Sequence, residues 1–344
     1  MKLLIVGSDK VFSIENFYVK YLNEMGVNVK IFTAQAIFYD YYFGGNIITK
    51  VLFKLGLSSI HKKINFQFKQ VVSEFKPEII WVFKGMEITP MSLKWAKKSG
   101  IKLVNYNPDN PFIFSGKGSG NSNITKSICL YDFHFTYNLE VKSQLENEFK
   151  ATAYSLPFGF DISAEVLKEV EKETEITKTC FVGNPDSKRV AFIKELANEG
   201  VDIDIYGNGW SRYINHKNIT IHQPVFELEL WKVLRRYRVQ LNPLRIHNTN
   251  SHGMRSFEVP AIGGIMLAQR TDEHTFFYEE GKEAFFYNNA VEGAIIINKL
   301  LLLSKNEANV IRVAARKRCI TSNYSYKERS IYVLEAFKRL ILLD

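Results

Sequence analysis

The residues best suited to chemistry gather in the segment Asn250–Gly264, which reads NSHGMRSFEVPAIGG. A turn at Gly253 leads into a short predicted helix, with Arg255 in its first turn and Glu258 one turn further along. Amides and a guanidinium are suited to hold a pyrophosphate, and a carboxylate can accept hydrogen bonds from a ribose diol. Alternatively, Glu258 is a carboxylate on the helix surface that pairs with Arg255. The first interpretation predicts a nucleotide site that contains His252, Gly253, Met254, Arg255, Ser256 and Glu258.

Two turns upstream combine glycine with polar residues. FVGNPDSKR (181–189) brings Lys188 and Arg189 to the start of a predicted helix, where their charges would face a phosphate. IYGNGW (205–210) would let a ligand approach the backbone closely. Alternatively, Lys188 and Arg189 are solvated charges and Trp210 belongs to the core. The residues predicted to bind the ligand in these turns are Gly183, Asn184, Lys188, Arg189, Gly207, Asn208 and Trp210, and Gln223 is predicted to bind it from further along the chain.

Two further clusters suggest a metal ion at first sight. His247 and His252 are close in the sequence, but no cysteine or carboxylate stands at ligand spacing beside them. Asp202 and Asp204 form an Asp-x-Asp pair, yet in an alternating strand both aspartates would simply point to solvent. We therefore expect no catalytic metal.

Strands and helices alternate along the chain at a spacing typical of parallel sheets that helices cover on both faces. The predicted class is α/β with two doubly wound units. The predicted strands are Lys2–Gly7, Val27–Thr33, Lys76–Gly85, Ile101–Asp109, Tyr131–Tyr137, Thr179–Gly183, Asp202–Gly207, Val239–Pro243 and Ile265–Gln269. The predicted helices are Ser13–Met25, Ile60–Phe75, Met91–Lys98, Val141–Phe149, Arg189–Glu199, Phe226–Tyr237, Arg255–Ile262, Ala290–Leu303, Glu307–Cys319 and Lys327–Leu342.

A chain of 344 residues suits two domains of about 150 residues each. Pro157 and Gly159 precede a charged run, which indicates a linker. The last predicted helix needs a surface to cover, because it carries apolar residues at Ile331, Leu334, Phe337 and Ile341. We expect a Rossmann-like domain over residues 1–160, a linker over 161–177, a second such domain over 178–325, and a helix over 326–344 that packs on the first domain.

The composition indicates a folded protein of a reducing compartment. Hydrophobic residues make up 46% of the chain, and Cys129, Cys180 and Cys319 are too far apart for a disulfide or zinc pattern. The apolar runs fall short of the roughly 20 residues that span a bilayer, and the opening residues lack the pattern of a signal peptide. A cytoplasmic location follows as the expectation.

The formal charge of +9 indicates an anionic partner. Alternatively, it reflects only a general bias in amino-acid composition. Every arginine lies at or beyond Arg189, so bidentate phosphate contacts are expected in the second half. The first half uses lysine alone, and its aromatic and basic stretch from Phe38–Phe43 to Lys63 suggests peripheral contact with an anionic membrane. We recognise no nucleic-acid module, so we expect no nucleic acid as a partner.

The segments RSFEVPAIGG (255–264) and FFYEEGKEAFFY (276–287) resemble the C-terminal domain of family-4-like glycosyltransferases, in the branch of CgeB-type spore-maturation proteins. The resemblance covers most of the chain and is strongest in the RSFE segment. In the N-terminal half, the segments that resemble this branch in the same order are KPEIIWVFKG (76–85), NPDNPF (107–112), YDFHFTYN (131–138) and LPFGFD (156–161).

The resemblance implies the GT-B fold, in which two Rossmann-like domains face a cleft. The first domain would hold a glycan or lipid-linked acceptor, and the second a nucleotide-sugar donor based on UDP or GDP. Glu258 would bind the donor ribose, whereas Asn250 stands where related enzymes often carry another glutamate. The implied activity is glycosyl transfer in the cytoplasm, at the inner face of the membrane. The alternative is a non-catalytic GT-B-like protein that binds nucleotide or glycan in envelope or spore-coat assembly.

An inverting transfer would need a base in the first domain to deprotonate the acceptor hydroxyl. Asp109, in the NPDNP turn, is the candidate for this base. Arg255 is the candidate for stabilising the charge that develops on the leaving diphosphate. Asp109 lies between two Asn-Pro steps and is alternatively an Asx-turn residue.

Overall fold

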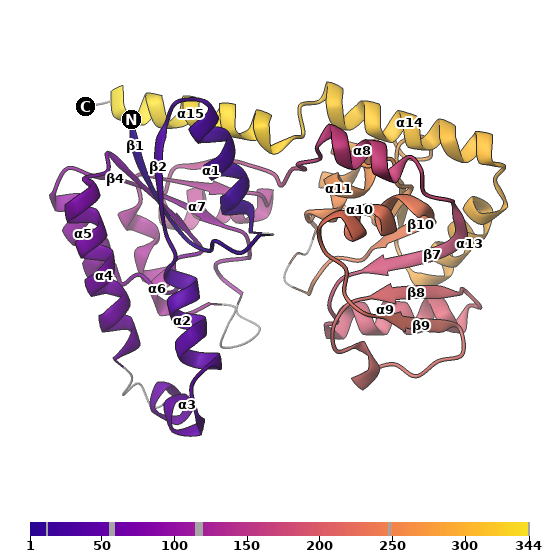
Figure 1. The fold of residues 1–344 in the computed structure, drawn as a ribbon, viewed down its shortest axis with the longest axis horizontal. Coiled ribbons are helices and arrows are strands. Elements are labelled where there is room, and N and C mark those ends of the chain that lie inside the picture. The colour runs from indigo at the N-terminus through magenta and orange to yellow at the C-terminus, as the bar shows by residue number, and fades with distance from the viewer. Residues whose placement is uncertain (12, 55–58, 114–119, 247, 249, 343–344) are drawn as a thin grey trace. The chain divides into compact units, whose positions relative to one another are not determined.

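The structure is a computed structural model that describes residues 1–344 except 12, 55–58, 114–119, 247, 249 and 343–344. His247 therefore lies outside the described residues. The chain forms two units, both drawn in Figure 1. Unit 1 contains Met1–Pro157 and Tyr326–Asp344, and unit 2 contains Phe158–Ser325. Each holds a six-stranded sheet, and the predicted α/β class is confirmed.

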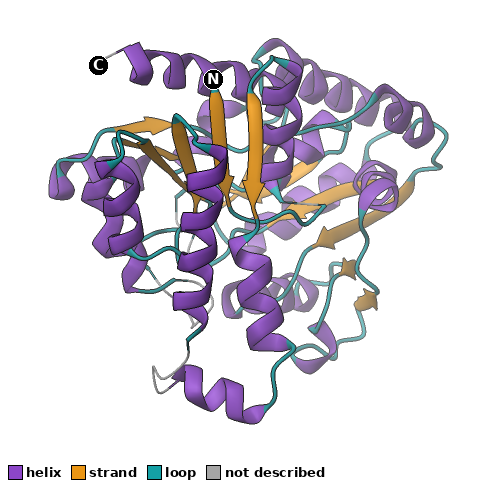
Figure 2. Ribbon diagram, turned by 60° about the vertical axis from the view of Figure 1, so that its left-hand side comes forward, coloured by secondary structure: helices purple, strands orange, loops and turns teal. Residues whose placement is uncertain are grey.

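The sheet of unit 1 has the strand order β2-β1-β3-β4-β5-β6, and neighbouring strands are parallel. Strand β3 is buried along its whole length, as expected where helices cover both faces of a sheet. Figure 2 shows the strands flanked by helices. The strands are β1 (Lys2–Val6), β2 (Asn28–Phe32), β3 (Ile79–Phe83), β4 (Lys102–Asn107), β5 (Phe133–Thr136) and β6 (Ala153–Ser155). The helices are α1 (Ile14–Glu24), α2 (Ala34–Phe43), α3 (Ile47–Lys54), α4 (Ile60–Phe75), α5 (Pro90–Lys98), α6 (Ser122–Ser127), the 3-10 helix η1 (Ile128–Leu130) and α7 (Leu139–Phe149).

The last helix, α15 (Tyr326–Leu342), belongs to unit 1 and packs against α1. Tyr326 stacks on Phe17 with ring centroids 4.5 Å apart, and Phe337 meets Trp81 edge to face. The buried face differs from the predicted one. Ile331 is exposed, because the positions that face the unit are Tyr326, Ser330, Val333 and Phe337.

Unit 2 has the strand order β12-β11-β10-β7-β8-β9, again with parallel neighbours. Its strands are β7 (Ile176–Val182), β8 (Ile203–Tyr206), β9 (Ile219–His222), β10 (Tyr237–Asn242), β11 (Met266–Gln269) and β12 (Phe285–Tyr287). Its helices are α8 (Ala164–Val170), α9 (Ser187–Asn198), the 3-10 helix η2 (Trp210–Arg212), α10 (Glu227–Arg236), α11 (Arg255–Ala261), α12 (Asp272–Phe277), α13 (Ala290–Leu302) and α14 (Lys305–Thr321).

The segment 161–177, which composition indicated as a linker, contains the helix α8 and the start of β7. The Ser163 hydroxyl caps α8 by accepting a hydrogen bond from the Val166 amide at 3.3 Å. Helix α8 packs against α10, and Val170 is buried. The helix was not predicted because this segment is rich in charged residues. The few apolar residues of α8 gather on one face of the helix.

The predicted solvent exposure of the Asp-x-Asp pair is wrong for Asp204. We expected both aspartates of the Asp-x-Asp pair to face solvent, but Asp204 is buried and only Asp202 is exposed. The Asp204 carboxylate pairs with Lys178 Nζ at 2.7 Å and accepts a hydrogen bond from the Tyr237 hydroxyl at 2.6 Å. These partners come from β7 and from β10, so the sequence around Asp204 gives no sign of them.

Glu15 is a buried carboxyl in the first turn of α1, with only 4% of its surface exposed. Its Oε1 accepts a hydrogen bond from the Ser8 amide at 2.9 Å. Burial raises the pKa of Glu15 from 4.5 to about 7, although hydrogen bonds from its own amide and from Ser8 favour the ion. Between these two values the folded protein binds more protons than the unfolded chain, so this group makes stability fall as pH rises.

We expect Glu15→Gln to raise the free energy of unfolding by about 1–3 kcal/mol at pH 8 and to change it much less at pH 4.5. The glutamine cannot ionise, yet its amide oxygen can still accept from Ser8. Urea unfolding at both pH values measures the effect, with Glu24→Gln on the exposed end of the same helix as the control. An equal effect of Glu15→Gln at both pH values would contradict a buried carboxyl with a raised pKa.

Candidate functional site

The strand order of unit 2 reverses between β7 and β10. From β7 the chain continues to β8 and β9 on one side, and it returns to β10, β11 and β12 on the other. In open parallel sheets, ligands bind beyond the carboxyl ends of the strands at such a switch point. The Arg189 Nε donates to the Pro243 carbonyl at 3.0 Å and so joins the segments that follow β7 and β10.

The turns after β7 and β8 are locked together. Trp210 Nε1 donates a hydrogen bond to the Gly183 carbonyl at 2.7 Å, and the Asn208 amide donates to Asn184 Oδ1 at 3.1 Å. A Cβ added to Gly207 would lie 2.2 Å from the Gly183 oxygen, so only glycine fits there. Trp210 is fully buried. Its side chain therefore belongs to the core, and it holds the turns without offering surface to a ligand.

Helix α9 starts at the same place. The Asp186 side chain caps it by accepting from the amides of Lys188 and Arg189, both at 3.1 Å. The Arg189 Nη1 also donates to the Asn184 carbonyl at 3.2 Å. Burial lowers the pKa of Arg189 to about 10 and also lowers the pKa of Lys188. Arg189 is therefore not a solvated charge, since its guanidinium is bonded to backbone carbonyls.

Helix α11 carries the two residues on which the nucleotide prediction depends. Glu258 is 5% exposed, and its Oε2 contacts the Arg255 Nη1, which belongs to a partly exposed side chain. Glu258 pairs with Arg255, as the alternative interpretation predicted. However, Glu258 is buried, so the prediction that it lies on the helix surface is wrong. Phe257 packs against Tyr324 with centroids 5.2 Å apart, which holds the opposite side of the helix.

A buried hydroxyl fixes the start of α11. Ser256 Oγ accepts from the Gly253 amide at 3.1 Å and from Asn242 Nδ2 at 3.0 Å. Burial lowers the pKa of His274 to about 4, so its imidazole is neutral at pH 7. Its Nδ1 lies 2.8 Å from the Gln269 carbonyl and must donate to it. His274 Nε2 therefore accepts from the Ser256 hydroxyl, at 2.7 Å.

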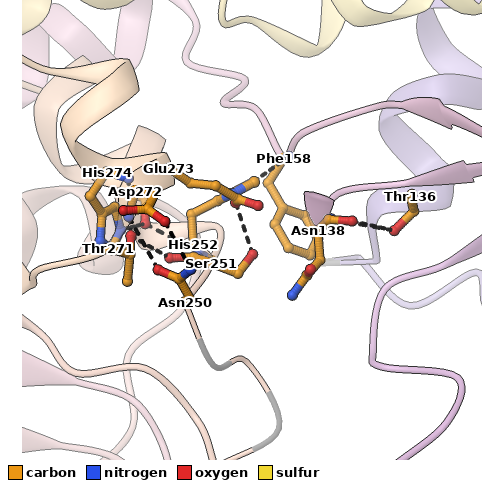
Figure 3. A network of polar contacts seen from close by, with 12 residues as sticks. Thr136, Asn138, Phe158, Asn250, Ser251, His252, Thr271, Asp272, Glu273 and His274 are labelled. Carbon is orange, nitrogen blue, oxygen red and sulfur yellow. Dashed lines mark hydrogen bonds and ion pairs between the residues drawn. The ribbon is translucent and has the colours of Figure 1, made fainter. Parts of the chain in front are cut away.

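A second buried network holds the loop before α11, as Figure 3 shows. His252 is fully buried, and its Nδ1 contacts the Glu273 carboxylate. Glu273 also accepts from the Ser251 hydroxyl at 2.9 Å, and His252 Nε2 accepts from the Phe158 amide at 3.3 Å. The side chains of His252 and Ser256 thus support the loop, and only their backbone remains for a ligand. No cluster of metal-ligating residues occurs in the part of the chain that the structure describes.

Asn250 adopts a left-handed backbone conformation with φ of 46°. Asparagine tolerates this conformation better than glutamate does. Its Nδ2 donates to Asp272 Oδ2 at 3.1 Å, and its Oδ1 accepts from the Asp272 amide at 3.2 Å, both at the start of α12 (Figure 3). The residue in place of the expected glutamate therefore ties this loop to α12.

The remaining predicted residues of unit 2 differ in their position. Gly253 has open space where a Cβ would stand, and its backbone is partly exposed beside Met254. Asn184 and Asn208 are exposed on the locked turns. Gln223 is exposed too, but it follows the edge strand β9, away from β7 and β10 in the sheet order.

In unit 1, Asp109 forms an ion pair with Lys84, with 3.0 Å between Nζ and Oδ2. The Asp109 amide donates to Asn107 Oδ1, also at 3.0 Å. An Asx turn is therefore present, but Asn107 supplies its side chain. The Asp109 carboxylate is partly exposed and held by Lys84.

Sequence reasoning missed the residues that support the site. Asp186 could have been found, because an aspartate directly before a helical pattern signals an N-cap. Glu273 and His274 gave no such signal, since they act on residues about twenty positions earlier in the chain.

Residues 188–335 match a family model described as "Glycosyl transferase-like". The search of curated proteins gave no match. Among solved structures, a sucrose-phosphate synthase from Thermosynechococcus elongatus is similar with a TM-score of 0.71 at 11% identity, covering 100% of both chains. A glycosyltransferase from Rickettsia africae ESF-5 has a TM-score of 0.66 at 15% identity, covering 99% of this chain and 98% of that one. Anabaena Alr3699/HepE, in complex with UDP and glucose, has a TM-score of 0.64 at 13% identity, covering 98% and 100%.

The chain has the GT-B fold. The expected architecture of two Rossmann-like units is thereby confirmed. The family match, together with this fold, supports a transferase enzyme that acts in glycosyl transfer.

We expect Gly207→Ala to lower the free energy of unfolding by about 2–4 kcal/mol, because the added methyl group collides with the Gly183 carbonyl. Gly253→Ala is the matched control. Its methyl group meets no other atom, so we expect a change within about 0.5 kcal/mol. Guanidinium unfolding of both variants measures the difference, and equal effects would show that the two turns are not locked as described.

Proposed function

We propose that this protein transfers a sugar from a nucleotide-sugar donor, with UDP or GDP as the nucleotide, to a glycan or lipid-linked acceptor at the cytoplasmic face of the membrane. The observation that carries this proposal is the buried Glu258, held by Arg255 on a helix whose start is fixed beside the switch point of unit 2. The resemblance to the CgeB-type branch remains a prediction.

The donor would lie along the carboxyl edge of unit 2. Arg255 would contact the diphosphate, and Glu258 would accept hydrogen bonds from the ribose hydroxyls. Lys188 and Arg189 would add positive charge near the phosphates. The other groups proposed to contact the donor are the backbone of Gly183, Gly207, His252, Gly253, Met254 and Ser256 and the side chains of Asn184, Asn208 and Gln223. Trp210 would act from the core by holding the turns.

The leaving group needs little acid catalysis. A nucleoside diphosphate leaves readily once N–H groups stabilise the negative charge that develops on it. The acceptor oxygen forms a bond to the anomeric carbon, and the diphosphate departs with the electrons of the broken bond. In an inverting transfer, Asp109 would take the proton of the acceptor hydroxyl. Unit 1 would then hold the acceptor, and unit 2 the donor.

A second candidate is a GT-B-like protein that binds a nucleotide or glycan without turnover. Asn250 favours this alternative, because it occupies a left-handed position and is bonded to Asp272. A donor-binding protein without turnover would bind the nucleotide-sugar and release no nucleotide in the presence of acceptors.

We expect Glu258→Ala to weaken the affinity for UDP or GDP by about 10- to 100-fold, because charge-assisted hydrogen bonds to the ribose are lost. Glu258→Gln keeps the size of the side chain and should show a smaller loss. Isothermal titration calorimetry measures both, with Glu195→Ala on the exposed face of α9 as the control. Unchanged affinity in a folded Glu258→Ala variant would remove Glu258 from the site.

Membrane contact is proposed through α3 and the end of α2. Phe43, Ile47 and Ile48 are exposed by 66%, 80% and 66%, and the lysines of this half would meet anionic lipid head groups. Within the described residues, no helix has the length and apolarity needed to cross a bilayer. The contact proposed for α3 and the end of α2 is peripheral, and it would bring the acceptor site near lipid-linked acceptors.

Vesicles that contain phosphatidylglycerol should bind the wild type at low salt, and binding should weaken as salt rises. The double variant Ile47→Asp, Ile48→Asp should bind at least about tenfold more weakly, because it loses apolar contact and gains negative charge. Met91→Asp changes an exposed apolar residue on α5 and is the control. Equal binding of both variants in sedimentation assays would argue against α3 as the contact.

A further inference from the structure

An amide at the end of β4 in unit 1 lacks a hydrogen-bond partner. Asn107 is 5% exposed, and its Oδ1 accepts from the Asp109 amide at 3.0 Å. This bond fixes the orientation of the side-chain amide. Nδ2 then has no partner among the described residues. Because a buried amide donor without a partner is costly, it marks a place where another molecule supplies the acceptor.

The same side chain lines a small cavity at the carboxyl edge of unit 1. Its lining includes the polar residues Lys84 and Thr136 and the apolar residues Ile124, Val141 and Leu145. The cavity has room for about one water-sized group. It therefore suits a single hydroxyl group whose carbon skeleton rests on apolar surface.

Lys84 is held in an unusual position beside this cavity. Its backbone is left-handed, with φ of 61°, and its amide donates to the Tyr106 carbonyl at 2.8 Å. Lysine rarely adopts this conformation, and such conformations are concentrated at functional sites. Its ammonium faces the Asp109 carboxylate at 3.0 Å. Since the two charges offset each other, the chemistry here favours a neutral hydroxyl over a phosphate.

We propose that this cavity binds one hydroxyl of a carbohydrate acceptor, with Asn107 Nδ2 donating a hydrogen bond to the hydroxyl oxygen. The inference rests on the proposed glycosyl transfer; it narrows the proposed acceptor to a carbohydrate and adds a residue that binds it. Lys84 lines the cavity and holds Asp109, so it joins the binding amide to the proposed base. Asn107 would thus orient the hydroxyl oxygen, and Asp109 would be linked to this site through its ion pair with Lys84.

Asn107→Asp tests this inference, because aspartate keeps the oxygen that accepts from the Asp109 amide and removes the Nδ2 donor. The probes are the methyl glycosides of glucose, galactose, mannose and N-acetylglucosamine, added with saturating UDP and followed by saturation-transfer NMR. At least one glycoside should bind the wild type, and its affinity should fall at least about tenfold in the variant. UDP affinity should stay unchanged. Asn28→Asp, on the exposed side of β2, controls for the added charge.

A second measurement does not require the aspartate variant to fold. In the wild type labelled with ¹⁵N-asparagine, the side-chain amide signal of Asn107 should shift when the glycoside is added. The signal is assigned by its loss in Asn107→Ser. An unchanged signal, equal glycoside affinity in wild type and Asn107→Asp, or no binding of any of these glycosides to the wild type would overturn the inference. Failure of UDP and GDP to bind would instead overturn the donor site of unit 2.

Discussion

The buried hydroxyl of Ser256 is the constraint on which the site depends. It receives hydrogen bonds from Gly253 and Asn242 and donates one to the neutral His274. These three partners belong to the loop before α11, to the end of β10 and to α12. A helix of only two turns would be marginal by itself, so this network and the packing on α14 keep Arg255 and Glu258 at the switch point.

The two units share a sheet topology but carry different charges at the point where the strand order reverses. In each, the strand order reverses once, between β1 and β3 in unit 1 and between β7 and β10 in unit 2. Unit 2 places arginines there, whose planar guanidinium groups can make bidentate contacts with the phosphate oxygens of a diphosphate. Unit 1 places Lys84 in an ion pair with Asp109 and buries Glu15 and Glu87, and burial raises the pKa of both glutamates to about 7. A site with offset charges, and with carboxyls whose ionisation is disfavoured by burial, fits a neutral, hydroxyl-bearing ligand better than an anion.

The sequence predicted local features well and long-range roles poorly. The alternation of strands and helices and the pair formed by Arg255 and Glu258 were readable, because apolar runs, glycine stops and helical spacing are local signals. The roles of His252 and Asp204 were not, since each is buried by partners far away in the chain, namely Glu273 for His252 and Tyr237 with Lys178 for Asp204. For Trp210 the sequence left a ligand contact and a core position open, and its burial and hydrogen bond to Gly183 decide for the core. A residue's type shows what it can bond to, but only the fold shows whether a ligand or the protein supplies that bond.

The most direct test of the donor site is amide hydrogen exchange with and without saturating UDP or GDP. We expect one nucleotide to slow exchange in residues 253–258 and in the turns 183–189 and 207–210, because a bound diphosphate would contact these amides. Binding of a nucleotide without protection of residues 253–258 would contradict the proposed donor site, because the ligand would then lie elsewhere than at α11.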